Sequence, residues 1–92
     1  MPVYHDSDGH RFTHSLPSGT AFLAYSLAGP GLVELYTTFV PPGDRGKGIA
    51  AGLVEAAVMY ARQARLRIIP SCWYVAEWMA QHPEHADLLA DT

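Results

Sequence analysis

The sequence predicts an α/β fold in which a mostly antiparallel sheet contains one parallel strand pair and is flanked by helices. Three observations predict it. Residues 11–40 contain runs that suit strands, separated by short turns with glycine and proline. From residue 49 the apolar residues recur at helical spacing for about four turns. A short apolar run and a second helical pattern follow, so we expect the last strand to lie parallel to the third after a crossover helix.

The strands of the first half are expected at residues 11–16, 20–27 and 32–40. The last of these runs, LVELYTTFV, is rich in β-branched and aromatic residues and is the clearest strand of the chain. Turn signals at residues 17–19 and 28–31 separate the runs, and such short connections favour antiparallel pairing. Residues 1–10 are polar and are expected to contain only a start and a turn.

The first helix is expected to begin at Ile49 and to end at Ala64. Three apolar residues between them continue the same face at steps of three or four: Leu53, Ala57 and Tyr60. A short buried strand is expected at residues 66–69, ended by Pro70. It would be the strand that pairs in parallel.

A second helix is expected after Ser71, and Pro83 ends it because proline clashes with the preceding turn. Three residues are expected to share one of its faces: Cys72, Ala76 and Met79. Trp78 lies off that face and, like Trp73, is expected in the core or at the edge of a pocket. Residues 84–90 can form a last short helix.

The composition limits the class of protein. The chain has 92 residues and is expected to form a single domain, residues 1–92, with 49% apolar and 16% charged residues. Its 6 basic and 9 acidic residues give a formal charge of −3, which favours neither nucleic acid nor a membrane surface as a partner. No apolar run reaches the length of a membrane span. With one cysteine and no signal-peptide pattern, the expected compartment is the cytoplasm.

The loop before the first helix, PPGDRGKGIA at residues 41–50, has the parts of a phosphate site. A helix begins with unpaired N–H groups and a partial positive charge. Gly46 and Gly48 would let a phosphate reach those N–H groups, and Arg45 and Lys47 add full charges beside them. The alternative is that the glycines only shape a turn and that the basic side chains are solvated.

Two nucleotide motifs fit this loop less well than a third. A Walker A loop requires Lys-Ser/Thr after its last glycine, and here Ile49 follows Gly48. Residues 46–51 formally match G-x-G-x-x-A, but the next strand ends at Pro70 without an acidic residue to bind a ribose. Residues 45–50 match R-x-x-G-x-A.

That third pattern resembles the acetyl-CoA-binding motif of the GNAT N-acetyltransferase superfamily. The resemblance continues through Pro70-Ser71-Cys72 to His82-Pro83-Glu84 and is to the minimal members of that superfamily. It implies a GNAT-like fold in which the strands at residues 32–40 and 67–70 splay apart to admit the pantetheine arm of acetyl-CoA or another acyl-CoA. The implied cofactor-binding residues are Val40, Arg45, Gly46, Lys47, Gly48, Ile49 and Ala50. The chain departs from the family in having Thr37-Thr38 instead of the frequent His-Thr pair, and Trp73 where many relatives have proline.

The resemblance places the thioester near the start of the second helix, which makes Cys72 and Tyr74 the candidate catalytic residues. A helix N-terminus favours the thiolate form of a cysteine, so Cys72 could accept the acyl chain or lie against the thioester. The alternative is a buried cysteine that serves as a small apolar residue. Tyr74 could donate a proton to the leaving thiolate, as a tyrosine does in many GNAT enzymes, or could simply pack.

Other polar side chains offer less specific patterns. Glu34 could act as a general base through water or be solvated on its strand, where alternation would put it on one face with Tyr36 and Thr38. His82 is expected to cap carbonyls at a helix end. The remaining histidines lack the spacing of metal ligands, so no metal site is expected.

The preferred function is therefore acyl transfer from acyl-CoA to an amine that the sequence does not identify. A non-catalytic acyl-CoA-binding or sensing module is the first alternative, because the chain lacks the helices and strands that build the acceptor pocket in full-length relatives. A small interaction domain, with the glycine loop as a mere turn, is the second. An exposed sheet edge leaves both a monomer and a homodimer open.

Overall fold

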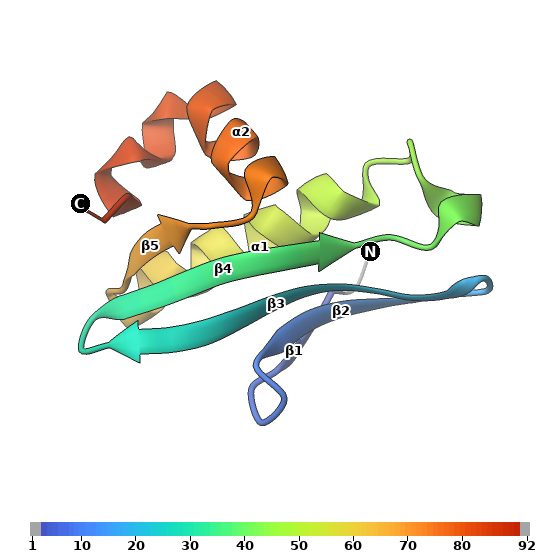
Figure 1. Ribbon diagram of the computed structural model, residues 1–92, viewed down its shortest axis with the longest axis horizontal. Helices are drawn as coiled ribbons and strands as arrows, with labels where there is room; N and C mark the ends of the chain where they lie inside the picture. The colour runs from blue at the N-terminus through green and yellow to red at the C-terminus, as the bar shows by residue number, and fades with distance from the viewer. Residues whose placement is uncertain (1–2, 91–92) are drawn as a thin grey trace.

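The computed structural model describes residues 3–90 and contains one mixed sheet. Its strand order is β1-β2-β3-β4-β5 (Figure 1). The strands are β1 (Tyr4–Asp6), β2 (Arg11–Leu16), β3 (Gly19–Gly29), β4 (Leu32–Phe39) and β5 (Arg67–Pro70). The first four strands pair antiparallel in sequence order, and β5 pairs with β4 in parallel. The predicted parallel pair is therefore confirmed.

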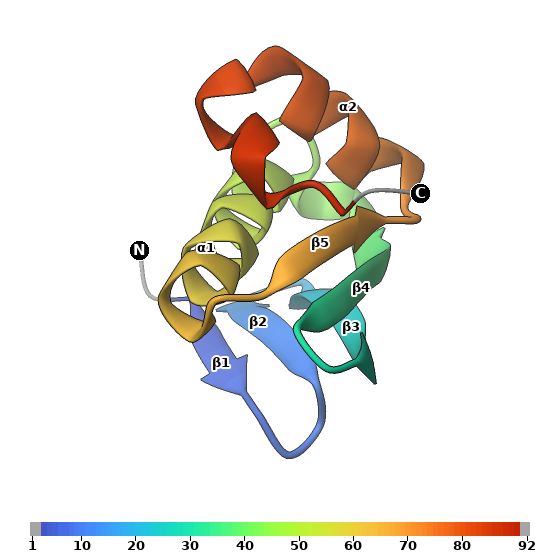
Figure 2. The same cartoon turned by 90° about the vertical axis from the view of Figure 1, so that its left-hand side faces the viewer.

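The helices lie on one side of this sheet. They are α1 (Ile49–Ala64), α2 (Trp73–Gln81) and two 3-10 helices, η1 (Pro42–Asp44) and η2 (Pro83–Leu88). Figure 2 shows α1 against one face of the sheet, with α2 above α1 and β5. In the part of the chain that the structure describes, no helix covers the opposite face of β2, β3 and β4 (Figures 1 and 2). α1 makes the crossover that a parallel pair requires.

The core lies between α1 and the sheet. α1 buries Leu53, Val54, Ala57, Val58 and Ala61 at helical spacing. The sheet, α2 and η2 supply the other large buried side chains: Phe12, Leu23, Tyr25, Val33, Leu35, Ile68, Val75, Trp78, Met79 and Leu88. Burial of these apolar side chains holds α1 across the strands and so sets the position of its N-terminal end.

Two local expectations differ from the structure. Residues 4–6 form the edge strand β1 instead of an irregular start. They have no apolar alternation, and only pairing with β2 makes them a strand. In α2 the buried residues are Val75, Trp78 and Met79, whereas Ala76 is only half-buried. Trp78 is in the core, as expected, and stacks on His82 with ring centroids 3.7 Å apart.

A β-bulge in β4 decides which of its side chains face the helices. Ala24 pairs with Thr37 and Tyr25 pairs with Leu35, so Tyr36 is the extra residue. Thr38 pairs with buried Leu23 and faces the helices, whereas Glu34 lies on the other face. The predicted alternation of Glu34, Tyr36 and Thr38 on one face is wrong, because the bulge shifts the alternation by one residue.

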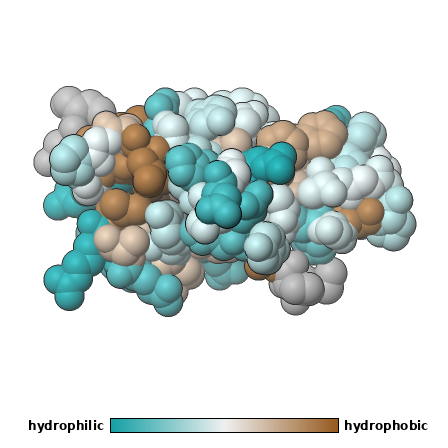
Figure 3. All heavy atoms as spheres, turned by 90° about the horizontal axis from the view of Figure 1, so that it is seen from below, coloured by the Kyte–Doolittle hydropathy of each residue, from teal (hydrophilic) through white to brown (hydrophobic). Residues whose placement is uncertain are grey.

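The apolar surface is divided among several elements. The large exposed apolar side chains are Tyr4, Leu27, Tyr36, Phe39, Met59 and Trp73. On the face shown in Figure 3, hydrophilic side chains occupy the centre and hydrophobic areas lie away from it. Among residues 3–90 no helix combines the length and the apolar character needed to cross a bilayer.

Candidate functional site

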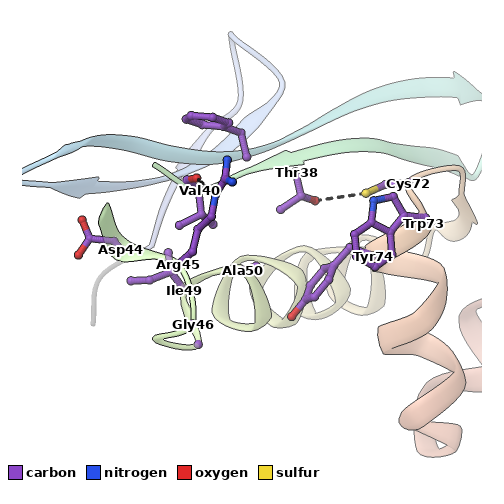
Figure 4. Close-up of a pocket in the computed structure, with 12 residues that line it drawn as sticks. Thr38, Val40, Asp44, Arg45, Gly46, Ile49, Ala50, Cys72, Trp73 and Tyr74 are labelled. Atoms are coloured by element: carbon purple, nitrogen blue, oxygen red, sulfur yellow. Dashed lines mark hydrogen bonds between the residues drawn. The ribbon is translucent and has the colours of Figure 1, made fainter. Parts of the chain in front are cut away.

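The site opens where the two parallel strands separate. Their pairing ends at Leu35 and Pro70. Beyond that point β4 continues to Phe39, whereas the segment after β5 turns into α2. A cavity of about 510 Å³ occupies the resulting space between β4, the loop before α1 and the start of α2 (Figure 4). Its lining is Thr38, Phe39, Val40, Asp44, Arg45, Gly46, Gly48, Ile49, Ala50, Cys72, Trp73 and Tyr74.

This cavity brings together all of the predicted site residues except Lys47. The residues of the glycine loop lie at one end and Cys72 and Tyr74 at the other (Figure 4). The loop and α2 are separated along the chain by α1 and β5, so the fold alone makes them neighbours. Lys47 lines a second cavity, which adjoins the first at Gly48 and Ile49.

The loop reaches α1 through two glycines in the left-handed region. Gly46 has φ 83° and Gly48, the N-cap of α1, has φ 79°. Residues with a Cβ rarely adopt this backbone conformation, so the backbone itself favours glycine at both positions. A Cβ at either position would meet no atom within 4 Å. The glycines therefore turn the chain and leave the space beside the helix open.

The N-terminal end of α1 has no side-chain cap among the described residues. The first intrahelical hydrogen bond runs from the Gly52 N–H to the Gly48 carbonyl oxygen at 3.1 Å. The N–H groups of Ile49 and Ala50 precede that bond, and both residues line the cavity. A pair of unpaired backbone donors with the positive end of a helix dipole suits an anion.

The two basic residues of the loop are held differently. Arg45 Nε donates to the Val40 carbonyl oxygen at 2.9 Å, while its terminal nitrogens have no hydrogen-bond partner among residues 3–90. Lys47 Nζ donates to Asp44 Oδ1 at 2.9 Å. The Ser18 hydroxyl donates to the other oxygen of Asp44. These hydrogen bonds hold the pKa of Asp44 below its usual value, and the bond from Ser18 has the largest effect.

Cys72 is fixed at the opposite end of the cavity. It is the N-cap residue of α2 and is 8% exposed. Its N–H donates to the Leu35 carbonyl oxygen at 3.0 Å, just beyond the last paired residues of the two strands. Its Sγ donates to Thr38 Oγ1 at 3.6 Å, the dashed line of Figure 4. Cys72 is thus a buried thiol with one face toward the cavity.

Tyr74 and Trp73 form the α2 side of the cavity. The Tyr74 hydroxyl points away from Cys72 in Figure 4. Burial, with a smaller effect of the Glu77 charge, raises the pKa of Tyr74. The phenol therefore keeps its proton at neutral pH and is a hydrogen-bond donor. Trp73 is 75% exposed and lies at the rim, with its ring edge-to-face against Tyr74.

Sequence reasoning missed two lining residues with structural roles. Thr38 accepts the hydrogen bond of Cys72, and its only signal was the unusual Thr37-Thr38 pair. Asp44 organises the loop, and its signal was an acidic residue three positions before Lys47. Neither contact follows from spacing alone, because Thr38 depends on the bulge in β4 and Asp44 on the turn at Ser18.

The remaining candidates lie outside the cavity. Glu34 Oε2 accepts a hydrogen bond of 2.5 Å from Ser71 Oγ and does not line the cavity. His82 Nδ1 lies 2.7 Å from the Trp78 carbonyl oxygen, which confirms its role at the end of α2. Within residues 3–90 no three His, Cys, Asp or Glu side chains are grouped so that they could hold a metal ion.

Residues 11–88 match the family model of the GCN5-related N-acetyl-transferases. The chain is 35% identical over 83 residues to Protein NATD1 of Bos taurus, covering 88% of this chain and 74% of that protein. It is 34% identical over 85 residues to Protein NATD1 of Gallus gallus, covering 90% and 77%.

The fold is also similar to that of a solved structure. The NMR structure of a GCN5-like protein from Staphylococcus aureus matches with a TM-score of 0.72 and 19% sequence identity, over 99% of this chain and 89% of that one. This likeness confirms the predicted GNAT-like α/β fold. Since the family model covers most of the chain and the NATD1 proteins share about a third of its residues, the chain belongs to the GCN5-related N-acetyltransferase family.

Proposed function

We propose that this protein is an acyl-CoA-dependent N-acyltransferase that transfers an acetyl or other acyl group to an amine. One observation carries the proposal: a single cavity joins an uncapped helix N-terminus to Cys72 and Tyr74 through the gap between β4 and β5. Its volume of about 510 Å³ suits a small-molecule site. Membership of the family supports acyl-CoA as the ligand.

The loop end of the cavity would hold the diphosphate of acyl-CoA. The N–H groups of Ile49 and Ala50 supply donors, and Gly46 and Gly48 leave the approach open. Arg45, oriented by the Val40 carbonyl, supplies a full charge with free donors. The pantetheine arm would then follow β4 beyond Leu35, where the strand edge no longer pairs with β5.

The α2 end of the cavity would hold the acyl group, and bound acyl-CoA supplies the thioester that an amine attacks. Positioning is the main contribution of the protein. When the amine and the thioester are held in the correct orientation, their bimolecular reaction becomes effectively unimolecular, which lowers the activation barrier. Tyr74 holds a proton on its hydroxyl for the departing sulfur. Cys72, bonded to Thr38, would either lie against the thioester or accept the acyl group on Sγ.

A non-catalytic acyl-CoA-binding module is the second candidate. One observation favours it: in the described part of the chain no helix covers the sheet face opposite α1, so no acceptor pocket is enclosed there. Under this alternative the same residues would bind acyl-CoA and release it unchanged, without transfer of its acyl group to an amine. The two candidates share a binding site and differ only in turnover.

Calorimetric titration with acetyl-CoA, followed by detection of free thiol over a panel of amines, tests both candidates. We expect binding, and thiol release with at least one amine. The variant R45Q should weaken acetyl-CoA binding about tenfold, since it loses a charged donor, while R65Q at the far end of α1 should not. Binding without thiol release on any amine would support the module, and absence of binding would reject both.

A further inference from the structure

The two ends of the first cavity differ in charge. In the described part of the chain, Arg45 is the only basic residue that lines this cavity, and it belongs to the glycine loop. Two carboxylates flank the α2 end. Glu34 accepts a hydrogen bond from Ser71, which precedes the N-cap of α2, and Glu77 follows Tyr74 by one helical turn. The end that would hold the thioester therefore suits an acceptor with a positive charge.

Glu77 has a carboxylate that is available to a cation. It is exposed and takes part in no ion pair within residues 3–90. Residues three and four positions apart share a helix face, and helix side chains lean toward the N-terminal end, so Glu77 is directed toward Trp73 and Tyr74. Burial first, and then the charge of Glu77, raises the pKa of Tyr74. The charge of Glu77 therefore acts on a residue that lines the cavity.

Trp73 offers an aromatic surface beside that carboxylate. Its exposed fraction of 75% is the highest among the large apolar side chains of residues 3–90. Its ring meets Tyr74 edge-to-face, with centroids 5.8 Å apart, and Figure 4 shows the two side chains together at the start of α2. This contact covers at most one face of the indole, and the face of an indole attracts a cation more strongly than other aromatic rings do. Trp73 and Glu77 together suit an alkylammonium group.

The reacting nitrogen of the acceptor belongs at a different place from this ammonium group. An amine attacks a thioester in its neutral form. Cys72 lies at the start of α2, where the positive end of the helix dipole disfavours an added cation. The position next to Cys72 therefore suits a neutral nitrogen, while a second nitrogen can stay charged on Trp73 and Glu77. A monoamine has no group for that second position.

We propose that the acceptor is a primary aliphatic amine with a second positive charge, and that Trp73 and Glu77 bind this second charge. The proposal rests on the proposed function and names its acceptor class. The neutral nitrogen attacks the thioester carbonyl carbon, so that a C–N bond forms and the C–S bond breaks. The sulfur leaves with the electron pair of that bond and accepts one proton, and the new amide nitrogen releases one. The second ammonium group makes no bond and holds the acceptor in position.

The test compares butane-1,4-diamine with butan-1-amine, which has the same carbon chain and lacks the second nitrogen. The kcat/KM of thiol release from acetyl-CoA is calculated for the form of each amine in which one nitrogen is neutral. We expect the diamine value to be about tenfold higher, the combined effect of one exposed cation–π contact and one exposed ion pair. Equal values overturn this proposal and leave the proposed function intact. Absence of thiol release with every amine overturns acyl transfer itself.

Two variants test the residues that bind the second charge. Both positions are exposed, so W73L and E77Q should fold, and each should reduce the tenfold ratio to about threefold. E84Q, at an exposed glutamate of η2 outside the cavity, makes the same change in net charge and should keep the tenfold ratio. Each ratio compares two amines in one variant, so an effect on Tyr74 cancels. An unchanged ratio in either W73L or E77Q contradicts the proposal.

Binding without turnover gives a second measurement. With coenzyme A, which has no acyl group to transfer, present at saturation, calorimetry should show tighter binding of butane-1,4-diamine than of butan-1-amine. E77Q should remove most of this difference, and equal binding to the wild-type protein would contradict the proposal. Spermidine and a lysine next to an arginine in a peptide both carry the required second charge. The higher kcat/KM of the two identifies a free polyamine or a protein side chain as the source of the acceptor.

Discussion

Cys72 and Thr38 show how one contact between distant residues orients a side chain at the α2 end of the cavity. The thiol is held by its own backbone bond to Leu35 and by its Sγ bond to Thr38, and it is 8% exposed. As the single cysteine of the chain, it can be followed without interference. Its accessibility therefore reports on the occupancy of the α2 end of the cavity.

We predict that acetyl-CoA slows alkylation of Cys72 by iodoacetamide at least tenfold, because the bound pantetheine arm would cover the open side of the thiol. The loss of free thiol, measured by mass spectrometry with and without the ligand, checks this. T38V, which removes the hydroxyl at nearly constant volume, should raise the rate in the free protein. Equal labelling in both conditions would show that the ligand does not reach Cys72.

Tyr74 gives a second prediction at the residue scale. Y74F should lower kcat about a hundredfold and change acetyl-CoA affinity less than twofold, because only the proton donor is lost. The pKa of Tyr74 is raised above 10.0, so the wild-type rate should decline only above pH 10, as the phenol ionises. A pH–rate profile of Y74F should lack that decline. The matched control is Y36F, an exposed tyrosine outside the cavity, and a Y74F rate equal to wild type would remove Tyr74 from the mechanism.

At the scale of elements, the N-terminal end of α1 carries the binding proposal. Two glycines lie one turn apart there with opposite conformational demands. Gly48 is left-handed at φ 79°, whereas Gly52 lies within the helix with open space where a Cβ would stand. The first needs glycine for its backbone, and the second does not.

We predict opposite stability effects for the two matched substitutions. G48A should lower the free energy of unfolding by about 1 kcal/mol, because alanine is strained in the left-handed region. G52A should raise it by about 0.5–1 kcal/mol, because alanine favours a helix interior over glycine. Urea unfolding measures both. No loss of stability in G48A would mean that Gly48 is not held left-handed in solution, and a loss in G52A would mean that the space beside Gly52 is not open.

At the scale of the whole molecule, an aromatic cluster joins the edge strand β1 to the core. His5 stacks on Phe12 at 4.2 Å and shares a hydrogen bond of 2.7 Å with the Tyr25 hydroxyl. Burial is the main cause that raises the pKa of Tyr25 to about 12, so the phenol stays protonated. Burial, more than the nearby charges, lowers the pKa of His5 from 6.5. The folded protein therefore favours neutral His5.

We predict that the free energy of unfolding decreases as the pH falls from 7 to 5. Because the pKa of His5 is lowered in the folded protein, the unfolded chain binds the proton more readily, and stability is lost as the pH drops below 6.5. H5N should flatten this slope in thermal unfolding at several pH values. H85N, at a histidine that is not among the groups that shift the pKa of His5, should not. A slope that persists unchanged in H5N would assign the effect to other groups.

Local sequence determined the elements that depend on neighbours along the chain. The bounds of α1, the three antiparallel strands and the glycine loop follow from periodicity, turn residues and left-handed glycines, which act within a few residues. The loop motif and the family resemblance named nine candidate site residues, and all of them except Lys47 line the first cavity. Thr38, Phe39 and Asp44 also line it and were not among those candidates. The binding and catalytic roles of the candidates stay predictions.

Tertiary structure alone decided the features that depend on distant partners. β1 exists because β2 pairs with it, and the bulge at Tyr36 turns Thr38 toward Cys72. Lys47 pairs with Asp44 and lines the second cavity instead of the first. None of these follows from spacing, since strand register and side-chain contacts across the sheet are settled by packing between segments far apart in the chain. The gap between β4 and β5 has the same origin, because it opens where their pairing ends at Leu35 and Pro70 and the chain turns into α2.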